Sequence, residues 1–227
     1  MSKTFVLSVG GSLIATPQGI DVKFLKEFRA FIIKQVKAGD KFFLISGGGA
    51  ICREYNKAAL AITKVDTKSL DWLGISAIRL NAQLLKTIFG PLAHEEIIID
   101  PTKKIKINKK IIIAGGYKPG RSSDYCAVLL AKHNNAKIVV NLSNIDYVYN
   151  KDPRQFTDAK KIARATWPEF QKIVGTKWQP GLNAPFDPIA SQEAAKNKLK
   201  VIIINGRKIK NLEACLKGKD FIGTIIS

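Results

Sequence analysis

Cysteine is scarce in this sequence, and the few that occur are not paired. Cys52, Cys126 and Cys215 lie far apart, with no spacing that suggests partners. This pattern excludes a disulfide framework and a cysteine-based zinc site. It is typical of proteins that stay in a reducing compartment, so we expect a cytoplasmic location.

Long apolar runs are also missing. No stretch approaches the roughly 18 uninterrupted apolar residues that a membrane-spanning helix needs, and runs such as 111–114 have only the length of a strand. The first residues, 1–11, show no small-residue cleavage pattern after their short apolar run. We therefore expect neither a membrane partner nor an export signal.

Acidic residues are few, which leaves a strongly basic chain. The sequence has 37 Lys and Arg against 18 Asp and Glu, a formal net charge of +19. Such a charge attracts polyanions, but most of the basic residues are Lys, whereas recognition of base edges and phosphates favours Arg. The basic clusters at 103–110 and 196–210 contain no interleaved aromatic residues. We expect the charge to steer phosphorylated substrates and consider nucleic acid an unlikely partner.

Short β-rich runs alternate with longer amphipathic segments along the whole chain. This alternation predicts an α/β fold, a mostly parallel central sheet sandwiched by helices in three layers, as one domain over 1–227. The predicted strands are 4–9, 41–46, 96–100, 110–114, 137–142, 200–205 and 221–226. The predicted helices are 22–39, a segment from the glycines at 47–49 towards Ala61, 70–89 and 124–133. Gly39 and Gly90 are the expected stops of the first and third helices.

One segment, 144–168, differs from the rest of the chain. It is rich in Asp, Asn, Lys and Pro and contains the sequence DYVYNKDP. We interpret it as an excursion from the sheet, with small hairpins over which a ligand could lie.

Glycine-bearing turns follow four of the strand regions. They are VGGSL (9–13), SGGGAICR (46–53), AGGYKPGRSSD (114–124) and, more weakly, QPGLNAPFDP (179–188). The ends of parallel strands meet along one edge of a sheet, so turns distant in sequence converge there. Bare glycine amides at a helix start bind phosphate well, although a single Gly-Gly pair is more often only a tight turn. None of the turns matches the Walker A or GxGxxG pattern.

The order of these motifs resembles the amino acid kinase family, most closely its archaeal-type uridylate kinases. The similarity runs through VGGSL, SGGGAICREY, LDWLGISAIRLNAQLL, GGYKPGRSSDYCAVLLAK, NLSNIDYVYNKDP and FDPIA, in register over nearly the whole chain. It implies an acceptor and phosphate lobe over about 1–134 and an ATP-binding lobe over about 135–227. It also implies ATP-dependent phosphorylation of UMP to UDP in pyrimidine nucleotide biosynthesis, with Mg²⁺ arriving on ATP, and a homo-oligomer that is commonly a hexamer.

The resemblance assigns residues to the ATP side of the site. The implied ATP-binding residues are Gly10, Gly11, Ser12, Gly49, Arg53, Ser143, Asn144, Tyr149 and Asp152. Ser12 is equally suited to capping the turn that follows it, and Arg53 to a surface ion pair with Glu54. Tyr149 would offer an aromatic surface to the base, although such a residue alone is more often part of a core. The role of Asp146 in the same segment stays open.

The acceptor side is assigned in the same way. The implied UMP-binding residues are Gly48, Asp71, Tyr117, Lys118, Pro119, Gly120, Arg121, Ser122 and Ser123. Asp71 is also an ordinary acid for the start of a helix, and the two serines form an ordinary helix cap. Gly11, Arg53 and Arg121 are the implied catalytic residues, and no protein metal ligand is expected.

Two positions depart from the family pattern. Many members carry Lys where this chain has Ser8, so we expect Arg121 or Lys118 to supply the missing cation. Tyr147 stands where the family usually has Gly. These departures leave two alternatives open: another kinase of the fold, with acetylglutamate, carbamate or isopentenyl phosphate as acceptor, or a non-catalytic nucleotide-binding or storage protein. The second pKa of a phosphate monoester lies near 6, so UMP needs no general base, and His94 and His133 fall outside the motifs.

Overall fold

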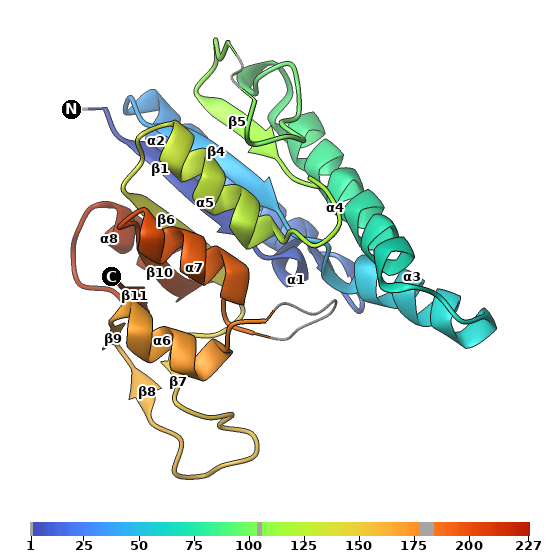
Figure 1. Ribbon diagram of the computed structural model, residues 1–227. Helices are drawn as coiled ribbons and strands as arrows, with labels where there is room; N and C mark the ends of the chain where they lie inside the picture. Colours follow the sequence, from blue (N-terminus) through green and yellow to red (C-terminus); the bar gives the residue numbers. More distant parts are fainter. Residues whose placement is uncertain (1, 104–105, 178–183) are drawn as a thin grey trace.

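A seven-stranded sheet forms the centre of the molecule (Figure 1). The computed structural model describes residues 2–103, 106–177 and 184–227. The strand order is β5-β4-β1-β6-β10-β11-β9. These strands are β1 (Thr4–Val9), β4 (Lys41–Ser46), β5 (Ile111–Ala114), β6 (Ile138–Ser143), β9 (Arg164–Ala165), β10 (Lys200–Asn205) and β11 (Thr224–Ile226). The strands from β5 to β10 run parallel, and β11 is antiparallel to β10.

Helices cover both faces of this sheet. One apolar core joins the sheet to α1 (Gly11–Ile14), α2 (Val22–Lys37), α4 (Thr67–Phe89) and α8 (Ile209–Leu216). The other joins it to α5 (Ser123–His133), α6 (Trp167–Val174) and α7 (Pro188–Lys196). Figure 1 shows α5 and α7 side by side across one face. The predicted mostly parallel α/β/α fold is therefore confirmed.

The helices that the spacing of apolar residues predicts are present. The expected 22–39 helix is α2, and Gly39, at φ +109°, follows its end. The helix after the second glycine turn is α3 (Gly49–Ile62). The expected 70–89 helix starts earlier, as α4, because the Asp66 side chain accepts a 3.0 Å hydrogen bond from the Ser69 amide and caps it. Gly90, at φ +54°, ends α4 and begins the short 3₁₀ turn η1 (Gly90–Leu92).

The predicted strand at 96–100 is wrong. Within it only Ile98 pairs with β5, through an isolated bridge to Ala114, and the other isolated bridge, Ala93 to Ile111, lies before the segment. The Ile98 amide donates to the Ile113 carbonyl at 2.9 Å, and no continuous ladder follows. The β-branched residues of this segment lie beside β5 at the edge of the sheet without forming a strand. Their preference for strand structure does not by itself decide the structure, because strand formation depends on pairing with neighbours. The predicted strand at 221–226 is present but shorter, as β11.

The segment at 144–168 leaves the sheet after β6, as predicted, but returns to it at β9, which pairs with β11. It forms a hairpin from β7 (Val148–Tyr149) and β8 (Lys161–Ile162), which projects below the sheet in Figure 1. A second small hairpin, β2 (Ala15–Thr16) with β3 (Gly19–Ile20), follows α1. The chain pattern did not predict α1, α6, α7 or α8, which are short helices of four to nine residues.

The described part of the chain contains no helix both long and apolar enough to cross a lipid bilayer.

Candidate functional site

The first two glycine turns are in direct backbone contact. They follow the neighbouring parallel strands β1 and β4, and the Gly47 amide donates to the Val9 carbonyl at 2.9 Å. A Cβ on Gly11 would lie 2.0 Å from the Gly49 nitrogen, and one on Gly49 would lie 2.4 Å from the Gly11 oxygen. Only residues without a side chain allow this approach, so the two turns form one surface of bare backbone.

The ends of two more strands join the same edge. The Gly10 amide donates to the Leu142 carbonyl at the end of β6, at 2.9 Å, and the Gly206 amide after β10 donates to the Ser143 carbonyl at 2.8 Å. The first glycine turn, with Ser12 in α1, therefore lies between the second glycine turn and the start of the 144–168 segment.

The second glycine turn opens α3 and is held from behind by α4. Buried Asn81 donates through Nδ2 to the carbonyls of Gly47 and Gly48, at 2.8 and 3.2 Å. A Cβ on Gly48 would meet Cys52, on the side of α4, whereas Gly49 faces the first turn. Arg53 lies one turn into α3, and its side chain forms no ion pair among the described residues.

The loop at 115–123 is tied to α4 at two points. The Gly120 amide donates to Oδ2 of Asp71 at 2.7 Å, and Arg79 Nε donates to the Gly116 carbonyl at 3.0 Å. Burial raises the pKa of Asp71 above its usual value, against the opposing effect of the Gly120 hydrogen bond. The interpretation of Asp71 as an acid at a helix start is wrong, because α4 begins at Thr67 with Asp66 as its cap; Asp71 instead fixes the backbone of this loop.

Two cations of this loop lie over aromatic rings of the same region. Lys118 Nζ is 4.9 Å from the ring centre of Tyr117, and the Arg121 guanidinium is 4.7 Å from that of Tyr125. After the turn at Pro119 and Gly120, the Ser122 hydroxyl caps α5 by accepting from the Tyr125 amide at 3.1 Å, and Ser123 is the first residue of the helix. The capping role of this pair is present, and a helix start of this kind also favours anions.

A buried carboxyl group lies directly behind the glycine turns. Oδ1 of Asp124 accepts from the Ser8 hydroxyl at 2.8 Å and from Asn141 Nδ2 at 3.0 Å, and Oδ2 accepts from the Asp187 amide at 3.2 Å. Burial is the main reason that the pKa of Asp124 rises to about 7, and the neighbouring Asp187 adds to it. This group connects β1, β6 and the start of α7 to α5.

The 144–168 segment borders a cavity of about 570 Å³, a size suited to a nucleotide. The residues named from the sequence for the ATP side, Ser143, Asn144, Tyr149 and Asp152, all line it. The Asp152 carboxylate is paired with Arg154, whose Nη2 lies 2.9 Å from Oδ2. The remaining lining comes from other residues within 143–154 and from Ile173, Ala184 and Pro185, and among the described residues none from the first two glycine turns is part of it.

Tyr147 also lines this cavity, and the ammonium group of Lys161 lies 5.2 Å from its ring centre. Asp146 next to it is held by the loop after β10, because it accepts from Asn205 Nδ2 at 3.0 Å and from Lys208 Nζ at 2.7 Å. Of the fourth glycine motif, residues 179–183 fall outside the described residues.

Several contributors to this site were missed from the sequence. They are Asn81, Arg79, Asp124, Asn141, Asp187 and the loop at 205–208. A signal existed for Asn141 and Asn81, since each is a polar residue within an otherwise apolar strand or helix face. Asp124 ends the loop motif at 114–124, and the sequence pattern indicates for it only the start of the helix predicted at 124–133.

The carboxylates of the site do not form a ready metal cage. Asp124 and Asp187 each already accept hydrogen bonds from the protein, and the described residues contain no group of three His, Cys, Asp or Glu arranged for a metal ion. A Mg²⁺ ion that brings phosphate and water ligands with it needs no such cage, so the donor set fits a nucleotide-borne metal.

Known proteins share this architecture over the full chain. A protein named uridylate kinase from Archaeoglobus fulgidus is 32% identical over 225 residues, covering 98% of this chain and 99% of that protein. One of the same name from Methanospirillum hungatei is 30% identical over 227 residues, covering 99% and 94%. The crystal structure of the A. fulgidus uridylate kinase aligns with a TM-score of 0.82, at 30% identity and full coverage of both chains.

A more distant structure, described as UMP kinase from Bacillus anthracis, shares the fold, with a TM-score of 0.79 at 18% identity over 100% of this chain and 96% of that one. The sequence model described as the amino acid kinase family matches residues 3–205. With this match over most of its length, and with full-length relatives at 30% identity or more, the chain belongs to the amino acid kinase family.

Proposed function

We propose that this protein is a uridylate kinase, which transfers the γ-phosphoryl group of ATP to UMP in pyrimidine nucleotide biosynthesis. The observation that carries the proposal is the contact between the two glycine turns. Their shared backbone surface has the nucleotide-sized cavity next to one side and the Asp71-held loop next to the other. The names of the full-length relatives support the same activity.

The chemistry needs little from the side chains. An oxygen of the UMP phosphate bonds to the γ-phosphorus of ATP while the bond from that phosphorus to the bridging oxygen breaks, so UDP and ADP form. The attacking phosphate is largely dianionic at neutral pH, and no proton has to be removed from it. Catalysis then depends on alignment of two phosphate chains and on neutralisation of their charge.

On the donor side, the amides of Gly11 and Gly49 would receive the ATP phosphates, and Gly10, whose own amide bonds to the Leu142 carbonyl, would leave room for the phosphates to approach the backbone. Ser143, Asn144, Tyr149 and Asp152 would bind the nucleoside, because they line the cavity, and Ser143 directly follows Leu142, whose carbonyl accepts from the Gly10 amide. Asp152 would exchange part of its pairing with Arg154 for a ribose hydroxyl. Mg²⁺, when it is bound with ATP, supplies further neutralisation of the phosphates.

On the acceptor side, the loop at 117–123 would hold UMP against Gly48. Asp71 keeps the Gly120 amide in place, and the Ser122 and Ser123 end of α5 offers its positive dipole to the UMP phosphate. Arg121 and Arg53 are the cations we assign to the transferring phosphoryl group. The Arg121 guanidinium lies over the ring of Tyr125. Arg53 forms no ion pair within the described residues.

A screen of acceptors tests the proposal. ADP release from ATP is measured with UMP, CMP, dUMP, acetylglutamate, carbamate and isopentenyl phosphate, each with Mg²⁺ present. We expect turnover with UMP to exceed that with every other acceptor. Preference for a carboxylate or for isopentenyl phosphate would assign another reaction of the same fold, and ATP binding without turnover on any acceptor would indicate a non-catalytic relative.

We also propose that the protein assembles with copies of itself, as a hexamer in the simplest extension of the family likeness, in the cytoplasm. The support from the structure is α3, in which only Gly49 and Ala50 are buried. Its outer part exposes large apolar side chains, with Leu60 at 54% and Ile62 at 84% of their surface. Figure 1 shows this end of α3 projecting away from the sheet together with the start of α4.

A further inference from the structure

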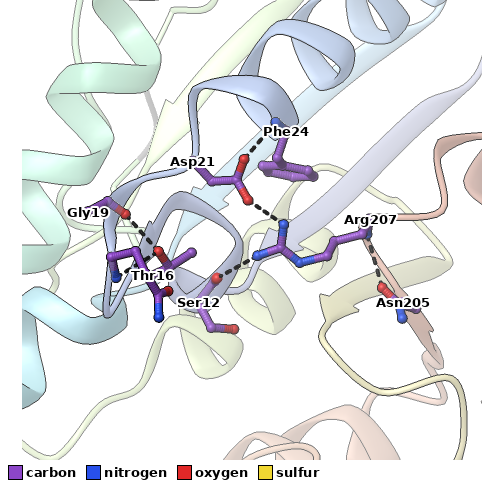
Figure 2. Close-up of polar contacts among 8 residues, drawn as sticks. Ser12, Thr16, Gly19, Asp21, Phe24, Asn205 and Arg207 are labelled. Atoms are coloured by element: carbon purple, nitrogen blue, oxygen red, sulfur yellow. Dashed lines mark hydrogen bonds and ion pairs between the residues drawn. The ribbon is translucent and has the colours of Figure 1, made fainter.

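Arg207, in the loop after β10, contacts the first glycine turn and the start of α2 (Figure 2). Its Nη2 donates to the backbone carbonyl of Ser12 at 3.4 Å, and its Nη1 donates to Oδ2 of Asp21 in a close ion pair. The contacts join residues 195 and 186 positions apart in the chain. The planar guanidinium thus links the Ser12 carbonyl in α1 to Asp21, the cap of α2.

Asp21 is itself fixed. Its other oxygen, Oδ1, accepts from the Phe24 amide at 2.9 Å and caps α2, and its own amide donates to the Ile14 carbonyl at 2.9 Å. The hydrogen bond from Arg207, followed by that from Phe24, keeps the pKa of Asp21 below its usual value. The carboxylate is therefore ionised at neutral pH and serves as an anchor that orients the guanidinium.

The same loop also bonds to the 144–168 segment, on the nucleoside side of the site. Asn205 and Lys208 both bond to Asp146, and a Cβ on Gly206 would lie 2.4 Å from Leu13 in α1. Residues 205–208 therefore contact α1, which carries the phosphate-facing turn, and also the segment that lines the cavity.

We propose that Arg207 is a positioning residue for the ATP donor, one that fixes the first glycine turn relative to the nucleoside cavity. By holding the Ser12 carbonyl, it fixes the peptide unit that joins Ser12 to Leu13, and with it the position of the neighbouring Gly11 amide. This inference rests on the proposed kinase function, because it assigns the phosphate chain of ATP to that turn. Its contacts do not reach the loop at 115–123, so its influence falls on ATP and not on UMP.

The test compares Arg207→Ala with wild type by steady-state kinetics and by equilibrium binding of a non-hydrolysable ATP analogue. Loss of one charge-assisted contact corresponds to about a tenfold change in an equilibrium constant. We expect KM for ATP and the dissociation constant of the analogue to rise by about that factor, while KM for UMP stays within about twofold. Arg207→Lys keeps the charge without the planar fork, so it recovers only part of the affinity.

Lys34→Ala is the matched control. It removes another partly exposed ion pair between distant elements, Lys34 with Glu213 at 3.1 Å, which lies away from the glycine turns. We expect neither KM value to change in this variant. If Arg207→Ala leaves ATP affinity unchanged, or if it alters both KM values to the same extent, the proposal is wrong.

Asp21→Asn separates positioning from direct phosphate contact. Asparagine still caps α2, but the guanidinium loses its ionic anchor. Positioning predicts weaker binding of the analogue, and an Arg207→Ala, Asp21→Asn double variant no weaker than Arg207→Ala alone. Unchanged or tighter binding in Asp21→Asn would overturn the proposal, since a freed guanidinium would then be contacting phosphate. Analogue binding needs no acceptor, so absence of UMP-dependent turnover would count against the kinase function only.

Discussion

The Ser8 hydroxyl donates a 2.8 Å hydrogen bond to the buried carboxyl group of Asp124, which joins the end of the central strand β1 to the start of α5. Many members of the family carry a lysine at the position of Ser8. A lysine there would place a charge beside the carboxylate, whereas a hydroxyl cannot neutralise it. The raised pKa of Asp124, about 7, is the electrostatic consequence of its burial next to Asp187.

Stability should therefore depend on pH through Asp124. Between pH about 4 and 7 the folded protein keeps a proton on this group that the unfolded chain has released, so the unfolding free energy falls as pH rises through that window, by up to about 1.4 kcal/mol per unit. Asp124→Asn cannot titrate and should lose this slope. Urea unfolding at pH 5 and pH 8 measures the difference, with the exposed Asp158→Asn as control. An unchanged slope in Asp124→Asn would show that other groups cause the dependence.

Gly11→Ala tests the contact between the glycine turns. The added Cβ would lie 2.0 Å from the Gly49 nitrogen, a backbone atom that cannot move aside without displacing α3. We expect a loss of about 3 kcal/mol or more in unfolding free energy, or failure to fold. Gly175→Ala is the control, because it has open space but combines φ +76° with ψ −168°, and should cost about 1–3 kcal/mol from backbone strain alone. Similar losses in both variants, measured by chemical denaturation, would argue against the close approach.

Asp71→Ala should weaken binding of UMP selectively. The variant frees the Gly120 amide and with it the loop at 117–123, so KM for UMP should rise by about tenfold while KM for ATP stays nearly constant. Asp66→Ala is the control on the same helix, since it removes the cap of α4 at a cost of about 1 kcal/mol without touching the loop. Equal effects of Asp71→Ala on both substrates would contradict this role.

Arg121→Ala should lower kcat more than it changes either KM. A cation that stabilises the transferring phosphoryl group acts mainly in the transition state, and its loss costs about 10²-fold in turnover. Lys103→Ala removes an exposed charge elsewhere and should have no effect. If turnover in Arg121→Ala equals that of wild type, the missing lysine at position 8 is compensated by a different group.

Ile62→Asp should disrupt self-assembly. The residue is 84% exposed at the end of α3, and a charge there would oppose burial of that apolar surface. Sedimentation velocity should show a shift towards smaller species, with Ile222→Asp, an exposed apolar position near β11, as control. An assembly state that is identical in both variants would place the interface elsewhere.

Residue types and their spacing predicted the elements whose structure depends on neighbours in the chain. The glycine turns after β1 and β4, the stop at Gly90 and the departure of the chain at 144–168 all follow from residue type and spacing. Four of the ATP-side residues found by family likeness line the cavity, Ser143, Asn144, Tyr149 and Asp152, whereas Gly10, Gly11, Ser12, Gly49 and Arg53 are not among its described lining residues. Their roles in binding stay predictions that the experiments above address.

Contacts between distant residues could not be predicted in this way. Ser8 and Asp124 are 116 positions apart, and nothing near either one indicates the other. Arg207 had no local motif at all, because its role depends on a carbonyl and a carboxylate nearly 200 residues earlier. The predicted strand at 96–100 is wrong for the opposite reason. Its residues have a strong local preference for strand structure, but at the sheet edge the segment pairs with β5 only through a single bridge.

The position of β11 also bears on how the hairpin beside the cavity is held. In the central sheet β9 pairs only with β11, and the Thr224 hydroxyl accepts from the Val148 amide at 2.9 Å in β7. The hairpin that borders the cavity therefore depends on this strand, because the Thr224 hydroxyl bonds to Val148 in β7 and to the Ile162 carbonyl in β8.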